Sequence, residues 1–322
     1  MVSVSDSTLI AQLQHPLLDT RLPLPGRYAG KVRDTYDLED RMLLIATDRL
    51  SAFDVILTSV PFKGQILNQI AAFWFDATKD IAPNHVISQP DPCALLARKC
   101  EALPVEVVVR GYITGSLWRD YQEGKAGVYG IDFPADLKKD QPFASPIITP
   151  STKAPIGEHD EPLSSAEVVS RGLVPGPLWE EVQRRALALF ARGQEIAAKQ
   201  GLILVDTKYE FGLYGDELLV IDEIHTPDSS RFWEAAEYDA RFAAGQEQRM
   251  LDKENIRQWL IQERGYKGQG PVPAIPDEVR VDLARKYVMN FERLTGKSFE
   301  PAVGDPNARL EKNLREAGLL AD

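Results

Sequence analysis

The stretch from Leu202 to Trp233 constrains the fold of this chain more than any other. Two apolar, β-branched runs flank the turn-rich Gly212–Asp216, which predicts a β-hairpin. Because side chains of a strand alternate between its two faces, Asp206, Lys208 and Glu210 should lie together on one face. The sequence therefore predicts a strand pair that carries charged groups inside apolar runs.

The second strand of this hairpin should bring further carboxylates toward the first. It carries Asp222 and Glu223, and the loop after it carries Asp228 and Arg231. Mg²⁺ prefers oxygen ligands, usually one or two carboxylates together with substrate phosphates, so the paired strands could hold one such ion. A solvated face of an antiparallel sheet is the alternative, although Asp and Glu are depleted in strands. Both interpretations stay open on the motif alone.

Composition limits the kinds of partner that the chain can bind. Its 322 residues carry a formal net charge of −11, which argues against a nucleic-acid surface built on phosphate contacts. Anionic substrates must then meet local clusters of Lys and Arg. No run reaches the ~18 apolar residues of a membrane span, and the N-terminus lacks signal-peptide features. With only Cys93 and Cys100, and no zinc-type histidine spacing, a reduced, cytoplasmic protein is expected.

A first candidate phosphate contact lies near the N-terminus. Residues 31–38 and 41–48 are predicted to be consecutive strands. Gly30 precedes the first strand, and Lys31 and Arg33 share one of its faces, so they could lie over the phosphates of a nucleotide. The glycine spacing excludes a Walker A loop. An ordinary edge hairpin is the alternative.

A second candidate phosphate contact lies in LPVEVVVRGYITGS. A predicted strand, Val105–Val109, ends in Arg110, and the loop GYITGS leads into a helix that should begin near Leu117 with Ser116 as its N-cap. Backbone N–H groups at a helix start, together with an arginine, can bind a phosphate. A plain strand–turn–helix with a capping serine is the alternative.

Residues 130–165 contain many prolines and are predicted to form a loop. Long irregular segments inside compact domains are often functional. Lys153, His159, Asp160 and Glu161 are the candidates there, and a solvated loop is the alternative.

Several segments together resemble one family. LPVEVVVRGYITGS and LILVDTKYEFG resemble the two signature segments of SAICAR synthetase (phosphoribosylaminoimidazole-succinocarboxamide synthase), and GKVRDTYDL, DRLSAFDVIL, ITPSTKA…GEHDE and DEIHTPDSSRFW are similar to its longer, yeast-like form. The resemblance implies an ATP-dependent ligase of purine biosynthesis. Such an enzyme joins the carboxylate of 5-amino-1-(5-phosphoribosyl)imidazole-4-carboxylate (CAIR) to the amine of L-aspartate, giving SAICAR, ADP and phosphate.

The resemblance also implies which residues bind ATP and its metal. Glu210 and Asp222 would hold Mg²⁺ at the ATP phosphates. Gly30, Lys31 and Arg33 would cover those phosphates.

Further roles follow for the other two substrates. Asp206 and Lys208 would act near the CAIR carboxylate, with Lys208 offsetting its negative charge. The implied binding residues are Arg110, Ser116, Asp228 and Arg231 for the ribonucleotide, and Lys153 and Asp160 for L-aspartate.

The implied architecture is α+β. Residues 1–112 would form an antiparallel-sheet domain that covers the nucleotide, as in kinases and ATP-grasp enzymes. Residues 113–262 would form a larger α+β domain with the metal and substrate site, and residues 263–322 a C-terminal helical segment. The sequence does not define the oligomeric state, and a monomer is compatible with it.

Two other functions would use the same carboxylates. An ATP-grasp-like or small-molecule kinase would transfer phosphate without an amine-binding site. A non-enzymatic nucleotide-sensing module would bind ATP and not turn it over. Product formation that requires an amine acceptor separates the ligase from both.

Overall fold

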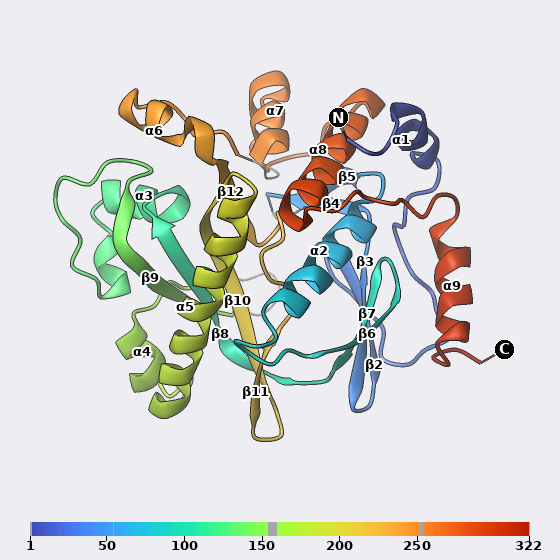
Figure 1. Ribbon diagram of the computed structural model, residues 1–322, viewed down its shortest axis with the longest axis horizontal. Helices are drawn as coiled ribbons and strands as arrows, with labels where there is room; N and C mark the ends of the chain where they lie inside the picture. The colour runs from blue at the N-terminus through green and yellow to red at the C-terminus, as the bar shows by residue number, and fades with distance from the viewer. Residues whose placement is uncertain (1, 54, 154–159, 251–253, 322) are drawn as a thin grey trace. The chain divides into compact units, whose positions relative to one another are not determined.

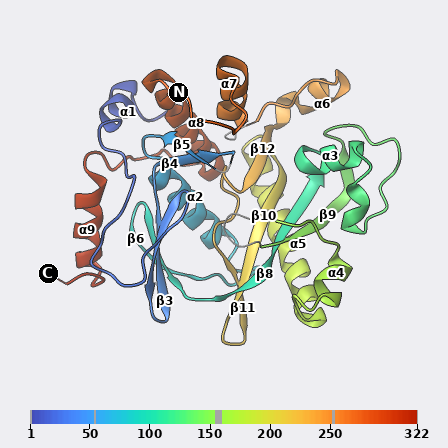
Figure 2. The same ribbon diagram turned by 180° about the vertical axis from the view of Figure 1, so that it is seen from behind.

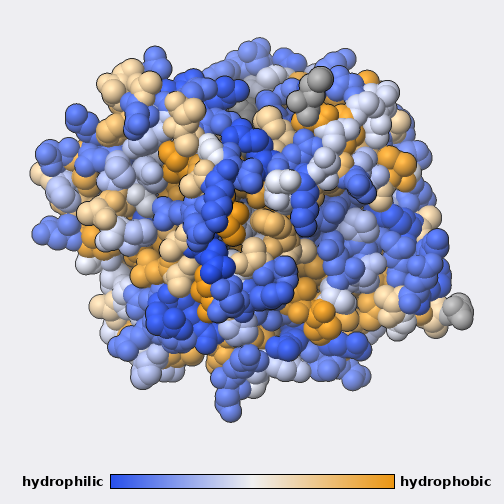
Figure 3. All heavy atoms as spheres, in the orientation of Figure 1, coloured by the Kyte–Doolittle hydropathy of each residue, from blue (hydrophilic) through white to orange (hydrophobic). Residues whose placement is uncertain are grey.

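The computed structural model describes residues 2–53, 55–153, 160–250 and 254–321. These residues form helices and antiparallel sheets, which confirms the predicted α+β class (Figure 1). They divide into unit 1, comprising Met1–Phe75, His85–Lys99 and Lys253–Asp322, and unit 2, comprising Asp76–Asn84 and Cys100–Asp252. Hydrophilic and hydrophobic residues are interspersed over the face shown in Figure 3. Among the described residues, no helix has the length and apolar character needed to cross a membrane.

Unit 1 contains a five-stranded antiparallel sheet with the order β1-β2-β3-β7-β6 and a separate β4-β5 hairpin. Leu310 and Leu314 of the last helix pack in one core cluster with Tyr36, Leu43 and Ile45 of the sheet. The strands are β1 (Tyr28–Ala29), β2 (Arg33–Leu38), β3 (Arg41–Ala46), β4 (Arg49–Ala52), β5 (Val55–Ser59), β6 (Val86–Asp91) and β7 (Ala94–Arg98). The helices that begin in this unit are α1 (Asp6–Gln12), α2 (Lys63–Ala77), α7 (Glu254–Arg264), α8 (Asp277–Thr295) and α9 (Pro306–Glu316).

Unit 2 contains a sheet with the order β11-β10-β8-β9, and β12 also pairs with β10. Helix α5 lies along β10 and β8, in front of them in Figure 1 and behind them in Figure 2. The strands are β8 (Glu101–Tyr112), β9 (Pro142–Thr152), β10 (Leu202–Tyr214), β11 (Glu217–Ile221) and β12 (Ser230–Glu234). The helices are α3 (Gly115–Gln122), the 3₁₀ turn η1 (Ala126–Tyr129), α4 (Ser165–Ser170), α5 (Gly176–Lys199) and α6 (Ala235–Ala243).

The predicted hairpin is confirmed. β10 and β11 pair antiparallel with Glu210 opposite Ile221, and the turn is confined to Gly215–Asp216. Two details are wrong. The second strand does not carry Asp222 and Glu223, because β11 ends at Ile221 and both residues follow it. The loop expected to carry Arg231 is strand β12 from Ser230 onward, paired with β10.

The prediction of a loop over residues 130–165 is wrong for its middle part, which is strand β9. Pro142, Pro146 and Pro150 interrupt the sequence pattern of a strand. Proline lacks the N–H that a central strand must donate, but it is tolerated in an edge strand. β9 is the terminal strand of its sheet, with β8 as its neighbour, so these prolines are compatible with the strand.

The division at residues 112 and 262 stays a prediction, as does the likeness to kinase and ATP-grasp domains. Strand β8 belongs to unit 2, and helices α7, α8 and α9 belong to unit 1.

A buried carboxylate ties the N-terminal segment of unit 1 to the start of α2. Asp48 is 4% exposed and accepts hydrogen bonds from the backbone N–H groups of Leu17 at 2.8 Å and Gly64 at 2.9 Å. Burial raises the pKa of Asp48 to about 6, although both N–H groups favour the ionised form. The folded state therefore binds this proton more tightly than the unfolded chain does.

Replacing Asp48 should change how stability depends on pH. Because the folded-state pKa of about 6 lies above the ordinary 3.8, ionisation of Asp48 removes about 1.4 kcal/mol of stability between pH 5 and pH 8. Asp48→Asn lacks this ionisation but leaves one N–H without an acceptor. In urea unfolding, the parent protein should have a higher free energy of unfolding than the variant at pH 5. This difference should be smaller by about 1.4 kcal/mol at pH 8. A difference in unfolding free energy that does not change with pH would contradict the expectation.

Candidate active site

The strand register of unit 2 places charged side chains on the sheet face that points away from α5. Val105, Val107 and Val109 of β8 are almost fully buried, and the alternate residues of that strand carry the charges. Two charged pairs are directly opposite each other on β8 and β10, namely Glu106 with Glu210 and Arg110 with Asp206. β12 then places Arg231 opposite Asp206 on the other side of β10.

A lysine lies between the two opposed glutamates. Lys208 Nζ donates to Glu106 Oε1 at 2.6 Å and to Glu210 Oε1 at 2.9 Å. Both carboxylates are largely buried, with side-chain exposures of 13% for Glu106 and 9% for Glu210. Like charges directly opposite on neighbouring strands destabilise a sheet, so the ammonium group is what makes this arrangement tolerable. Lys153, just after β9, also pairs with Glu210.

The electrostatics of this cluster keep Lys208 protonated. Burial alone would lower the pKa of Lys208, but Glu210, Glu106 and Asp222 together raise it well above its ordinary value. Burial raises the pKa of Glu106, Lys208 opposes that shift, and Glu210 and Asp160 add to it. Lys208 is therefore a fixed cation and not a proton acceptor at neutral pH.

Two arginines converge on Asp206 beside the start of α3. Arg231 Nη1 lies 2.7 Å from Asp206 Oδ2, and Arg110 Nη1 lies 3.3 Å from the same oxygen. Arg110 also donates to Thr149 Oγ1 at 2.8 Å and to Ser116 Oγ at 3.3 Å. Two guanidinium groups share the carboxylate of Asp206 and supply donors next to the N–H groups of a helix start. This part of the site can bind a phosphate.

Ser116 lies in this group, but not as the predicted N-cap. The N-cap is Thr114, and α3 begins at Gly115. The carbonyl of Thr114 accepts the N–H of Trp118 at 3.3 Å, so helical hydrogen bonding starts two residues earlier than expected. Ser116 is thereby inside the first turn, where its hydroxyl accepts from Arg110.

The Gly30–Arg33 turn of unit 1 is held by an arginine that sequence reasoning missed. Arg49 donates to the carbonyl of Gly30 at 3.0 Å and to that of Lys31 at 3.1 Å. Asp34, fully buried, holds the same guanidinium at 2.7 Å. Gly30 N–H closes the turn on the carbonyl of Arg33 at 2.8 Å. The backbone of the turn is fixed, and Lys31 is exposed.

Four predicted residues remain, namely Asp160, Asp228, Glu161 and His159. Asp160 is exposed and acts electrostatically on Glu106. Asp228 lies in the loop before β12, where its N–H donates to Thr226 Oγ1 at 3.2 Å. Glu161 pairs with Arg171 at 3.0 Å, and His159 lies outside the described residues.

Glu106 is the acidic residue that the sequence analysis did not select. Its signal was present, because a glutamate inside the run LPVEVVV contradicts the strand preference of its neighbours. Only the register of β8 against β10 reveals that it faces Glu210.

The donor chemistry of the cluster fits a hard divalent cation. In the described parts of the chain, no group of three or more His, Cys, Asp or Glu side chains is arranged to hold a metal. Mg²⁺, however, commonly takes only one or two protein carboxylates and completes its shell with phosphate oxygens and water. Glu210 and Asp222, whose charges both act on Lys208, carry oxygens of this type.

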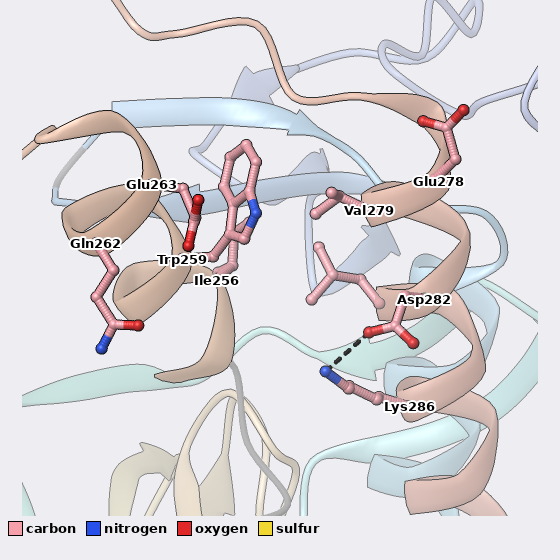
Figure 4. Close-up of a pocket in the computed structure, with 9 residues that line it drawn as sticks. Ile256, Trp259, Gln262, Glu263, Glu278, Val279, Asp282 and Lys286 are labelled. Atoms are coloured by element: carbon pink, nitrogen blue, oxygen red, sulfur yellow. Dashed lines mark ion pairs between the residues drawn. The ribbon is translucent and has the colours of Figure 1, made fainter.

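Unit 1 contains a pocket of about 490 Å³ between α7 and α8. Figure 4 shows Trp259 and Glu263 on one side and Glu278, Val279 and Asp282 on the other. The lining contains three carboxylates, of Glu263, Glu278 and Asp282, and one ammonium group, that of Lys286, which pairs with Asp282 at 2.8 Å. This negative lining does not suit a phosphate or a carboxylate substrate.

Removing the Lys208 ammonium should destabilise the fold in a pH-dependent manner. Lys208→Met leaves two buried carboxylates facing each other, which should cost about 3 kcal/mol of unfolding free energy at pH 8. The loss should be smaller at pH 5, because Glu106 can then take up a proton. The control is Lys199→Met, which removes an exposed pair with Glu195 at 2.8 Å and should cost less than about 1 kcal/mol in urea unfolding. Equal losses for the two variants would contradict the expectation.

The chain is similar to known proteins along most of its length. A family model described as SAICAR synthetase matches residues 26–273. The chain is 48% identical over 307 residues to a putative phosphoribosylaminoimidazole-succinocarboxamide synthase 2 of Mesorhizobium japonicum, covering 92% of this chain and 98% of that protein. It is 46% identical over 306 residues to the phosphoribosylaminoimidazole-succinocarboxamide synthase of Legionella pneumophila, covering 93% and 97%.

The chain also resembles a solved structure of this family. The SAICAR synthase of Saccharomyces cerevisiae, complexed with SAICAR, is 34% identical with a TM-score of 0.78, covering 88% of this chain and all of that one. Because the family model spans most of the chain and the relatives align over nearly their whole length, the chain belongs to the SAICAR synthetase family.

Proposed function

We propose that the charged cluster of unit 2 is where this chain carries out the reaction of its family. As a member of that family, the chain is an ATP-dependent carbon–nitrogen ligase of purine biosynthesis that joins CAIR to L-aspartate. One observation carries the assignment of the site: Lys208 lies between the opposed Glu106 and Glu210. It is two residues along β10 from Asp206, which two arginines share. Structural ion pairs alone do not require so much buried charge on one sheet face.

The chemistry explains why ATP is consumed. A carboxylate is a poor electrophile, so the CAIR carboxylate oxygen attacks the γ-phosphorus of ATP and ADP leaves. The aspartate nitrogen then attacks the acyl carbon, the C–O bond to phosphate breaks, and the amine loses a proton. Such phosphoryl transfer depends mainly on positioning and on charge neutralisation. Lys208, held protonated, offsets the negative charge of the CAIR carboxylate.

The ribose 5′-phosphate of CAIR is assigned to the two arginines beside α3. Arg110, Arg231 and Ser116 supply donors, and guanidinium groups suit phosphate because they can bind it in a bidentate manner. Asp206 holds both arginines, which supports a role next to CAIR, and Asp228 shapes the same pocket.

The metal is assigned to two carboxylates of unit 2. Glu210 and Asp222 would hold Mg²⁺, which would neutralise charge on the ATP phosphates. In unit 1, the resemblance implies that Gly30, Lys31 and Arg33 would cover ATP phosphates. Lys153 and Asp160 face L-aspartate. A cytoplasmic location and the lack of nucleic-acid or membrane partners stay predictions from the sequence, which does not define the oligomeric state.

The reaction is tested by ADP release from Mg-ATP, with CAIR and L-aspartate added singly and together. We expect turnover only with all three, and a product heavier than CAIR by one aspartate less water. ADP release with CAIR alone, without the amine, would favour the kinase. ATP binding without turnover under every combination would favour the nucleotide-sensing module.

Loss of either metal-binding carboxylate should stop turnover and leave the fold intact. Glu210→Gln and Asp222→Asn each remove one anionic oxygen ligand and should lower kcat by at least about 100-fold. Asp216→Asn is the matched control, since Asp216 lies exposed in the turn of the same hairpin. Turnover is measured at saturating Mg-ATP, with circular dichroism as the check on folding. A variant that keeps the parent kcat is not a metal ligand.

Loss of Arg110 should weaken binding of the ribonucleotide. Arg110→Ala removes a charge-assisted phosphate contact of about 2 kcal/mol, so KM for CAIR should rise roughly 30-fold with little change in KM for ATP. Arg119→Ala, an exposed arginine of α3, serves as the control. If Arg110→Ala raised only the KM for ATP, the two phosphate sites would be exchanged.

A further inference from the structure

The guanidinium group of Arg231 occupies the space that a side chain at position 115 would fill. A Cβ placed on Gly115 would lie 2.2 Å from Nη1, 2.3 Å from Nη2 and 2.5 Å from Cζ of Arg231. These distances are far below van der Waals contact. Only glycine at this position allows the guanidinium to lie against the backbone at the start of α3.

The conflict would be confined to a movable group. The three atoms nearest to the added Cβ belong to the tip of a long side chain, and Arg231 is 30% exposed. The side chain can therefore swing away without moving the backbone. A substitution at position 115 should displace Arg231 and leave α3 and the sheet in place.

The position of Arg231 matters because of what it contacts. Its Nη1 donates to Asp206 at 2.7 Å, and Asp206 also accepts a hydrogen bond from Arg110. Arg110 in turn donates to Ser116, the residue after Gly115. Gly115 thus brings the guanidinium from β12 to the helix start, so that one phosphate could meet both arginines and the first turn of α3.

We propose that Gly115 is a positioning residue for the ribonucleotide phosphate, acting through Arg231. This inference rests on the proposed phosphate site. Its expected signature is weaker binding of CAIR with a nearly unchanged kcat, because the reacting carboxylate lies at the Lys208 cluster and not at the phosphate.

Gly115→Ala tests the inference against Gly124→Ala. Both glycines have a left-handed backbone, with φ of +58° and +68°, so alanine is strained at both. A Cβ at Gly124, just past the end of α3, would meet nothing within 4 Å. We expect similar losses in Tm for both variants. KM for CAIR should rise by on the order of tenfold to a hundredfold only in Gly115→Ala, with KM for ATP unchanged.

Gly115→Asn is a second test, in which the new residue tolerates the left-handed backbone of this position. Asparagine adopts the left-handed conformation more readily than alanine but carries the same Cβ. It should recover Tm and keep the raised KM for CAIR. A normal KM in Gly115→Asn, at a normal Tm, would overturn the proposal.

Combining Gly115→Ala with Arg231→Ala separates this inference from the proposed function. If Gly115 acts through Arg231, the double variant should have the same KM for CAIR as Arg231→Ala alone. A further rise in the double variant would overturn the positioning role. If Arg231→Ala itself left the KM for CAIR unchanged, the phosphate site and the inference built on it would both fail. A raised KM in Arg231→Ala with a normal KM in Gly115→Ala would refute the positioning role alone.

Discussion

The ammonium group of Lys208 between Glu106 and Glu210 is the interaction on which the candidate site depends. Two largely buried carboxylates lie directly opposite each other on neighbouring strands, where they would repel and would resist losing water. Lys208 donates to both carboxylates and so makes the arrangement possible, and Lys153 pairs with Glu210 as well. A sheet that only had to be stable would be expected to carry apolar side chains at these positions, so the charge is better explained by binding.

The register of β10 connects this interaction to the phosphate site. Glu210 and Asp206 lie four residues apart on one strand, and the partner strands place Glu106, Arg110 and Arg231 beside them. A slip of one residue would turn these side chains into the apolar layer under α5. The valines of β8 that fill this layer therefore also fix the spacing between the carboxylate cluster and the arginine pair.

Sequence patterns predicted the parts of the site that depend on local order. Alternation along one strand places Asp206, Lys208 and Glu210 on one face, and a strand that ends in Arg110 before a glycine-rich loop is also a local signal. Glu106, Arg49 and the role of Gly115 were missed because each depends on a partner distant in sequence: Glu210, the Gly30 turn and Arg231. Strand β9 was missed because proline weakens the sequence pattern of a strand. Proline is tolerated in β9 because this strand lies at the edge of its sheet.

The prolines of β9 have a consequence for how copies of this chain behave in a crowded solution. An edge strand normally offers a row of unpaired N–H and C=O groups, on which a strand from another molecule can add. Pro142, Pro146 and Pro150 cannot donate, so the row is broken at intervals along this edge. The same residues that hid the strand from sequence analysis make it a poor template for edge-to-edge aggregation.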